Sequence, residues 1–253
     1  MAAYFHLPAG LAIQIDPAIQ TGPQKLSEKE IKTFPMNLAA RLTILFFFIV
    51  MMVNGQSEVI KLDFAGRKIP VRIILPEGYT ANKSYPVLIG PGLDNGNLDM
   101  GCRYFGTQPK KQGWILVESS IHMEDRKAVR LLLDYLESNY NTAKTFILGF
   151  SANSVDAFSI ASIYSDRIDG IIGMPGNPNP RSIQKHKNQQ ILMIVGERDT
   201  HWKKRAESAK VALDKAACQS ELVIIPNGGH ILDELAGEAL FSILKKKLQL
   251  KNH

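Results

Sequence analysis

An alternation of short apolar runs with segments of helical period is the feature that most constrains the fold of this chain. Two alternating segments, SEVIKLDFAG and KIPVRIILP, come first and predict an antiparallel pair of strands with Gly66-Arg67 in the turn. Six further apolar runs follow along the chain: YPVLIG, GWILVESS, KTFILGF, IDGIIGM, QILMIVG and SELVIIP. The pattern therefore predicts about eight strands.

Helical segments separate these runs. Residues 124–141 place five apolar side chains on one helical face, namely Val129, Leu132, Leu133, Leu136 and Tyr140. The same period recurs after Ser151 and in WKKRAESAKVALDKAA, and an amphipathic C-terminal helix is expected to open with Leu232, Leu235 and Ala239. Strands that alternate with helices predict an α/β fold, a mostly parallel sheet with helices on both faces.

The composition is typical of a soluble globular protein. Apolar residues make up 45% of the chain and charged residues 21%, and 253 residues suit one sizeable α/β domain. The net charge is +6, but the lysines are scattered, and the densest run, Lys245-Lys246-Lys247, has no interleaved aromatic residues. Because nucleic-acid binding requires a concentrated basic surface, no nucleic-acid partner is expected.

Residues 36–55 have the pattern of a secretory signal peptide. Arg41 precedes the apolar run LTILFFFIVMMV, and Val53 and Gly55 stand at the small-residue positions before a cleavage site. The run is shorter than the roughly 20 residues of a spanning helix, although a buried core segment or an uncleaved anchor is an alternative. We expect export to the periplasm or the extracellular space, with membrane contact only through this signal.

The signal peptide would follow 35 residues that have no clear helical or strand period. We therefore hypothesise that translation begins at Met36, that residues 1–35 are not part of the mature protein, and that the folded domain spans residues 56–253. Cys102 and Cys218 are the cysteines of that domain and could form one disulfide. Neither lies in a CxxC pair or beside a histidine cluster, so no metal site is expected.

Three residues suited to nucleophilic hydrolysis follow three of the apolar runs. Ser151 follows TFILGF, Asp199 follows ILMIVG and His230 follows LVIIP. In a parallel sheet these positions share the edge formed by the carboxyl ends of the strands. A serine hydroxyl needs a neighbouring base to accept its proton, histidine suits that role near neutral pH, and a carboxylate orients the imidazole. The sequence therefore predicts a Ser-His-Asp triad.

An oxyanion formed during such a reaction needs hydrogen-bond donors. The N–H of Ala152, at the start of the predicted helix, is one candidate. The other is the N–H of Leu93 or of Gly92, in the glycine-rich loop GPGLDNGN after the third strand.

Each of these residues also has a simpler interpretation. Ser151 and Asp199 could be helix caps, since both residue types are favoured there, and Glu197 is a competing acid. His122, His186 and His201 compete with His230 for the role of base, and we expect them to be solvated or structural. His122, Trp202 and Met174 are weaker candidates for substrate contact, and Trp202 and Met174 are equally consistent with core positions.

The segments GPG, GFSAN, GERD and GGH, in this order, resemble the α/β-hydrolase superfamily, in particular its compact serine esterases and its dienelactone-hydrolase-like or depolymerase-like members. The resemblance covers nearly all of residues 57–253 and implies an eight-stranded hydrolase domain. One position departs from the family pattern G-x-S-x-G, because Asn153 replaces its final glycine. Its side chain is expected either to shift the turn slightly or to point into a roomier pocket.

Residues 175–190, where many such proteins insert a lid, are too few for a helical cap, so an open site is expected. It would suit soluble esters or esters carried on a polymer. The leading interpretation is an exported serine hydrolase that cleaves carboxylic esters through an acyl-enzyme, with neither metal nor organic cofactor. A serine peptidase of the prolyl-oligopeptidase type and a non-catalytic binding protein on the same scaffold are the alternatives, and the sequence does not specify the oligomeric state.

Overall fold

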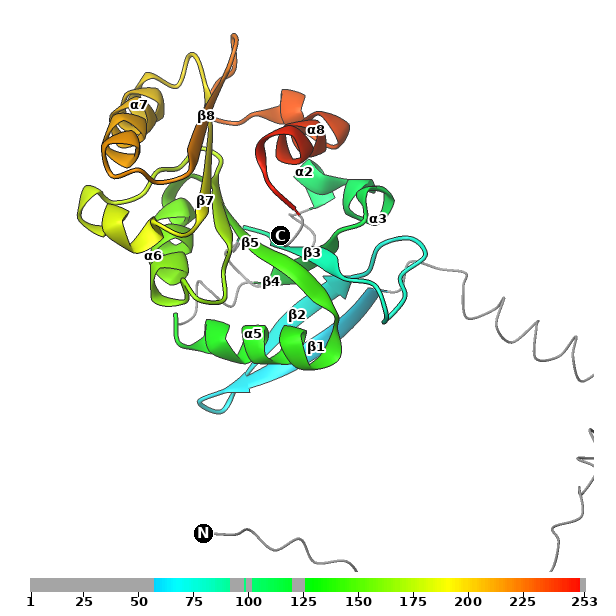
Figure 1. Cartoon of the computed structure of the whole chain (residues 1–253). Helices are drawn as coiled ribbons and strands as arrows, with labels where there is room; N and C mark the ends of the chain where they lie inside the picture. The colour runs from blue at the N-terminus through cyan, green and yellow to red at the C-terminus, as the bar shows by residue number, and fades with distance from the viewer. Residues whose placement is uncertain (1–56, 92–97, 99–101, 120–125, 251–253) are drawn as a thin grey trace, which may run out of the picture. The chain divides into compact units, whose positions relative to one another are not determined.

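An eight-stranded sheet is the centre of the computed structural model (Figure 1). The model describes residues 57–91, 98, 102–119 and 126–250, all of which belong to one of the two units of the chain, Leu45–His253. The predictions for residues 1–35 and for the signal peptide at 36–55 concern residues outside the described ranges. Within the described ranges, no helix has the length and apolarity needed to cross a membrane.

The strands follow the order β1-β2-β4-β3-β5-β6-β7-β8 across the sheet. β2 pairs antiparallel with both β1 and β4, and all the other pairs are parallel. This confirms the predicted mostly parallel sheet of eight strands. Their bounds are β1 Ser57–Phe64, β2 Arg67–Ile74, β3 Tyr85–Ile89, β4 Ile115–Ser119, β5 Thr142–Gly149, β6 Gly170–Gly173, β7 Gln190–Gly196 and β8 Ser220–Ile225.

Helices cover both faces of the sheet (Figure 1). One face carries α5 (Ala128–Asn139), α6 (Ser154–Ile163) and α7 (Thr200–Lys215), and the other carries α2 (Cys102–Phe105), α3 (Gln108–Gln112) and α8 (Glu238–Lys247). Successive residues of β5 serve the two faces in turn: Ile147 packs under α5 and α6, whereas Phe146 and Leu148 pack toward α8. The apolar runs of the central strands are therefore continuous because both of their faces are buried.

Short 3-10 helices complete the described fold: η2 (Ser151–Asn153), η3 (Pro180–His186) and η4 (Asp233–Leu235). Between β6 and β7, where every residue is described, η3 is the only helix, and this segment contains no helical cap.

Two local expectations need correction. The first hairpin turns at Ala65-Gly66 rather than Gly66-Arg67, and both turn residues have positive φ. The C-terminal helix begins only at Glu238, because the positive φ of Gly237, +76°, prevents the helix from starting earlier. Leu235 instead packs in the core from η4. Strand β8 lies at the edge of the sheet, and its residues are mostly half-buried.

Candidate active site

The turn between β5 and α6 holds Ser151 in an unusual backbone conformation. Ser151 has φ +52°, a region that non-glycine residues adopt uncommonly and at a cost of about 1–3 kcal/mol. Its N–H donates to the carbonyl of Pro175 at 3.0 Å. Ser151 lies outside α6, which begins at Ser154, and its hydroxyl contacts a histidine rather than the helix N-terminus. Its side chain is therefore not a helix cap.

Close approach of backbones makes this turn sharp. A Cβ added at Gly149 would lie 2.4 Å from the Cα of Ser154, and one added at Gly176 would lie 2.4 Å from the Cβ of Ser154. The fully buried Ser154 hydroxyl donates to the carbonyl of Ser151 at 2.6 Å. Glycines at these two positions allow the first turn of α6 to pack directly on the end of β5.

Asn153 contributes a hydrogen bond to the same turn. Its Oδ1 accepts from the N–H of Phe150 at 2.7 Å. Its backbone is right-handed, with φ −75° and ψ −7°, so the position has no conformational need for glycine. The side chain does not point into a pocket, as one of the two expectations had it, but folds back on the turn and bonds to the Phe150 N–H.

Ser151, His230 and Asp199 form one hydrogen-bonded chain. His230 Nε2 lies 2.9 Å from Ser151 Oγ, and His230 Nδ1 lies 2.6 Å from Asp199 Oδ2. These partners favour the tautomer with its proton on Nδ1, which leaves Nε2 free to accept the serine proton. The structure therefore brings together the three residues that the sequence analysis singled out, from the loops that follow β5, β7 and β8.

Asp199 both caps a helix and contacts His230, so the two interpretations of this residue hold together. Its Oδ1 accepts from the N–H of Trp202 at 3.3 Å and caps α7, while its Oδ2 contacts His230. The side chain is only 8% exposed, compared with 43% for His230. The helix N-terminus thus holds the carboxylate in a fixed position.

The competing acid Glu197 has a different partner. Its Oε2 accepts from the N–H of Asn227 at 2.9 Å, and the side chain of Arg198 donates to the carbonyl of the same residue at 2.7 Å. A Cβ added at Gly196 would lie 2.1 Å from the carbonyl oxygen of Gly229. Residues at the end of β7 therefore hold the loop that carries His230. No local sequence pattern indicated this role for Glu197 or Arg198.

No protein-family model matches this sequence, and no curated protein is similar to it in sequence. Solved structures do resemble it. A dienelactone hydrolase from Anabaena variabilis matches with a TM-score of 0.59 and 17% identity, over 77% of this chain and 99% of that one. A thermostable esterase matches with a TM-score of 0.56 and 15% identity, over 68% and 54%. An acylaminoacyl peptidase from Pyrococcus horikoshii matches with a TM-score of 0.59 and 11% identity, over 82% and 44%.

The chain has the α/β-hydrolase fold. It spans nearly the whole dienelactone hydrolase but only about half of the thermostable esterase and less than half of the peptidase. At these identities the similarity concerns the fold alone, and a shared fold does not imply a shared activity.

In this α/β-hydrolase fold, Ala152 presents a backbone donor beside Ser151. Within the described ranges, the N–H of Ala152 has no acceptor, whereas the N–H of Ser151 is already bonded to Pro175. The other oxyanion candidates, Leu93 and Gly92, lie outside the described residues.

Two aromatic rings lie near His230. The ring centroids of Phe150 and Trp202 lie 5.7 and 6.5 Å from that of His230. Trp202 is half-buried at the site, whereas Met174 is 1% exposed and packs in the core below α8. Of the two expected wall residues, only Trp202 lies beside the histidine.

The two other histidines among the described residues, His186 and His201, do not join this site. His186 is fully buried, and its Nδ1 lies 2.7 Å from Gln189 Oε1, while burial lowers the pKa of its imidazole. His201 is exposed at the start of α7 and packs edge-on against Trp202. His122 lies outside the described residues. Within the described ranges, no group of three or more metal-ligating side chains is arranged to hold an ion.

Proposed function

We propose that this protein is a serine hydrolase that cleaves carboxylic esters, with Ser151 as nucleophile. The observation that carries the proposal is the continuous chain from Ser151 Oγ through His230 to Asp199, with distances of 2.9 and 2.6 Å. Such a chain supplies the base that a serine hydroxyl requires and the carboxylate that orients the base.

The reaction proceeds in two halves. Ser151 Oγ attacks the ester carbonyl while His230 Nε2 accepts the hydroxyl proton, and Asp199 stabilises the imidazolium. The N–H of Ala152, together with that of Leu93 or Gly92, holds the oxyanion. His230 then gives its proton to the leaving alcohol, and an acyl-enzyme remains on Ser151. Water activated by His230 releases the acid and restores the serine hydroxyl.

The positive φ of Ser151 supports the role of nucleophile. The strained conformation is maintained by the packing of Ser154 against Gly149 and Gly176, and by the bond from the Ser151 N–H to Pro175. Strain of this kind is typical of functional positions. A serine that served only to cap a helix would have no need for it.

Labelling with a fluorophosphonate tests the proposal, since this probe reacts covalently with activated serines. We expect mass spectrometry to place the adduct on Ser151, and labelling to disappear in Ser151→Ala and to fall strongly in His230→Ala. Ser165→Ala, which alters an exposed serine in the turn after α6, is the matched control and should label like the wild type. Equal labelling of Ser151→Ala would refute the assignment.

Substrate class is tested on the same protein. We expect hydrolysis of p-nitrophenyl acetate and no release of p-nitroaniline from peptide anilides. Peptide cleavage without ester cleavage would favour a serine peptidase. A folded protein that neither labels nor hydrolyses would instead be a binding protein on a hydrolase scaffold.

The proposal includes export of the enzyme. Residues 36–55 would direct secretion and be removed after Gly55, so that the mature protein begins at Gln56. N-terminal sequencing of the protein from its native source tests this, and any peptide from residues 1–35 would contradict the proposed start at Met36.

A further inference from the structure

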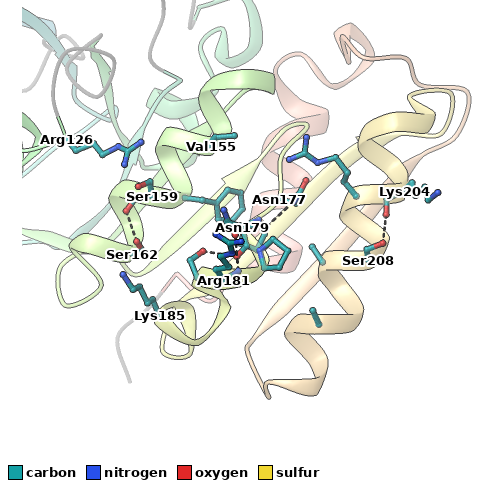
Figure 2. A pocket seen from close by; sticks show the side chains of 17 residues that line it. Arg126, Val155, Ser159, Ser162, Asn177, Asn179, Arg181, Lys185, Lys204 and Ser208 are labelled. Atoms are coloured by element: carbon teal, nitrogen blue, oxygen red, sulfur yellow. Dashed lines mark hydrogen bonds between the residues drawn. The ribbon is translucent and has the colours of Figure 1, made fainter.

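A cleft of about 720 Å³ lies beside the candidate active site, between α6, η3 and α7. Figure 2 shows side chains from these three elements converging on it. Val155, which lines the cleft, is four residues beyond Ser151 and belongs to the first turn of α6. The cleft therefore begins at the first turn of α6, four residues along the chain from the candidate nucleophile.

Every ionisable residue that lines the cleft is basic: Arg126, Arg181, Lys185, Lys204 and Arg205. All five are exposed. Arg126 pairs with Asp156 at 3.1 Å. In the part of the chain that the structure describes, Arg181, Lys185 and Lys204 have no carboxylate within ion-pair distance. Several uncompensated positive charges around one cleft create a positive electrostatic potential inside it, which attracts anions.

The polar lining also offers hydrogen-bond acceptors. The hydroxyls of Ser162 and Ser208 donate to backbone carbonyls of α6 and α7, so their remaining lone pairs can accept. A complementary ligand therefore carries hydroxyl donors in addition to negative charge.

Arg205 and Trp202 connect the cleft to the candidate active site. The Arg205 guanidinium stacks over the Trp202 ring at 4.4 Å, and the Trp202 ring lies 6.5 Å from that of His230. A ligand that fills the cleft thus extends toward His230 along the Trp202 side and toward Ser151 along the first turn of α6.

We propose that this basic cleft binds the acidic carbohydrate part of an ester substrate. Saccharides with carboxylate groups supply both the negative charges for the five basic side chains and the hydroxyl donors for the two serines. This inference rests on the proposed ester hydrolase function, which it makes more specific. The substrate is then an ester borne on an acidic saccharide, whose polar chain the cleft holds while the ester bond lies at Ser151.

Calorimetric titration of the full chain tests binding without requiring catalysis. Tetragalacturonate is the acidic probe and cellotetraose the neutral one, and both are titrated into wild type and into Ser151→Ala. We expect tetragalacturonate to bind both proteins equally, and at least about tenfold more tightly than cellotetraose, since only the acidic saccharide can form charge-assisted hydrogen bonds with the arginines and lysines. Equal affinity for the two saccharides, or no binding of either, would overturn the proposal.

Charge variants show where the saccharide binds. We expect Arg181→Gln and Lys204→Gln each to weaken tetragalacturonate binding by about tenfold or more. Lys61→Gln removes the same charge from an exposed position on β1, at the far edge of the sheet, and should leave the affinity unchanged. An equal loss in all three variants would mean that binding follows net charge rather than the cleft, and would overturn the assignment.

Protection of the serine shows whether the cleft belongs to the substrate site. We expect saturating tetragalacturonate to slow fluorophosphonate labelling of Ser151, and cellotetraose to leave the rate unchanged. Binding without protection would overturn the link between the cleft and the substrate. A failure of the ester hydrolase proposal is recognised separately, because the protein would then not label even in the absence of saccharide.

Discussion

Replacing Asn153 by glycine restores the usual family residue, yet we expect it to destabilise this protein. The substitution deletes the bond from the Phe150 N–H to Asn153 Oδ1, which is 2.7 Å long. An intramolecular hydrogen bond contributes about 1 kcal/mol net to stability. Because the Asn153 backbone is right-handed, glycine adds a further cost of about 0.3 kcal/mol through its lower helical propensity. The free energy of unfolding should therefore fall by about 1.3 kcal/mol.

Thermal unfolding followed by circular dichroism measures this effect. A domain of this size loses about 2–4 °C of Tm per kcal/mol, so Asn153→Gly should melt about 3–5 °C below wild type. Asn153→Asp keeps an acceptor oxygen for Phe150 and should melt closer to wild type. Since the same turn positions Ser151, the glycine variant should also label more slowly with fluorophosphonate. A glycine variant as stable as wild type would refute the idea that this bond holds the turn.

Two further predictions concern Asp199 and His186. Asp199→Asn keeps the shape of the side chain but favours the wrong His230 tautomer, so kcat for p-nitrophenyl acetate should fall by about four orders of magnitude; a loss of less than tenfold in a folded variant would show that Asp199 does not orient the base. Burial lowers the pKa of His186, so the folded protein binds fewer protons at this site than the unfolded chain, and stability should fall as the pH drops below about 6.5. Urea unfolding at a series of pH values measures this dependence, which His186→Gln should reduce; an unchanged pH profile in that variant would contradict it.

Residues beyond the proposed triad determine the geometry of the candidate site. Asp199 is held by the N-terminus of α7, and the loop that carries His230 is held by Glu197 and Arg198. The geometry of the Ser151–His230–Asp199 chain therefore depends on the packing of β7 against that loop at Gly196. Substitutions at these supporting positions should impair the reaction without touching substrate.

Local sequence patterns determined much of the fold. The apolar runs of β3 to β7 were recognisable because strands buried on both faces need apolar residues at every position. The alternation in β2 was visible because that strand buries one face more deeply than the other. The same runs placed Ser151, Asp199 and His230 at strand ends, since a parallel sheet gathers the carboxyl ends of its strands at one edge.

Other features were decided only by tertiary contacts. The position of β4 between β2 and β3 depends on pairing between distant segments, which no local pattern encodes. From the sequence alone, Asn153 is expected either to shift the turn or to point into a pocket. Its role as hydrogen-bond acceptor becomes apparent only once the fold places the Phe150 N–H beside it.

The basic cleft is a further feature that tertiary structure decides. Its lysines and arginines looked scattered along the sequence, as expected for a solvated surface. The fold places Arg126, Arg181 and Lys204, from three separate segments, around one cleft. The residue types that carry chemistry could be found from the sequence, because local strand and helix patterns position them. Which charges act together was decided by the tertiary structure, since an electrostatic field depends on distances in space and not on separation along the chain.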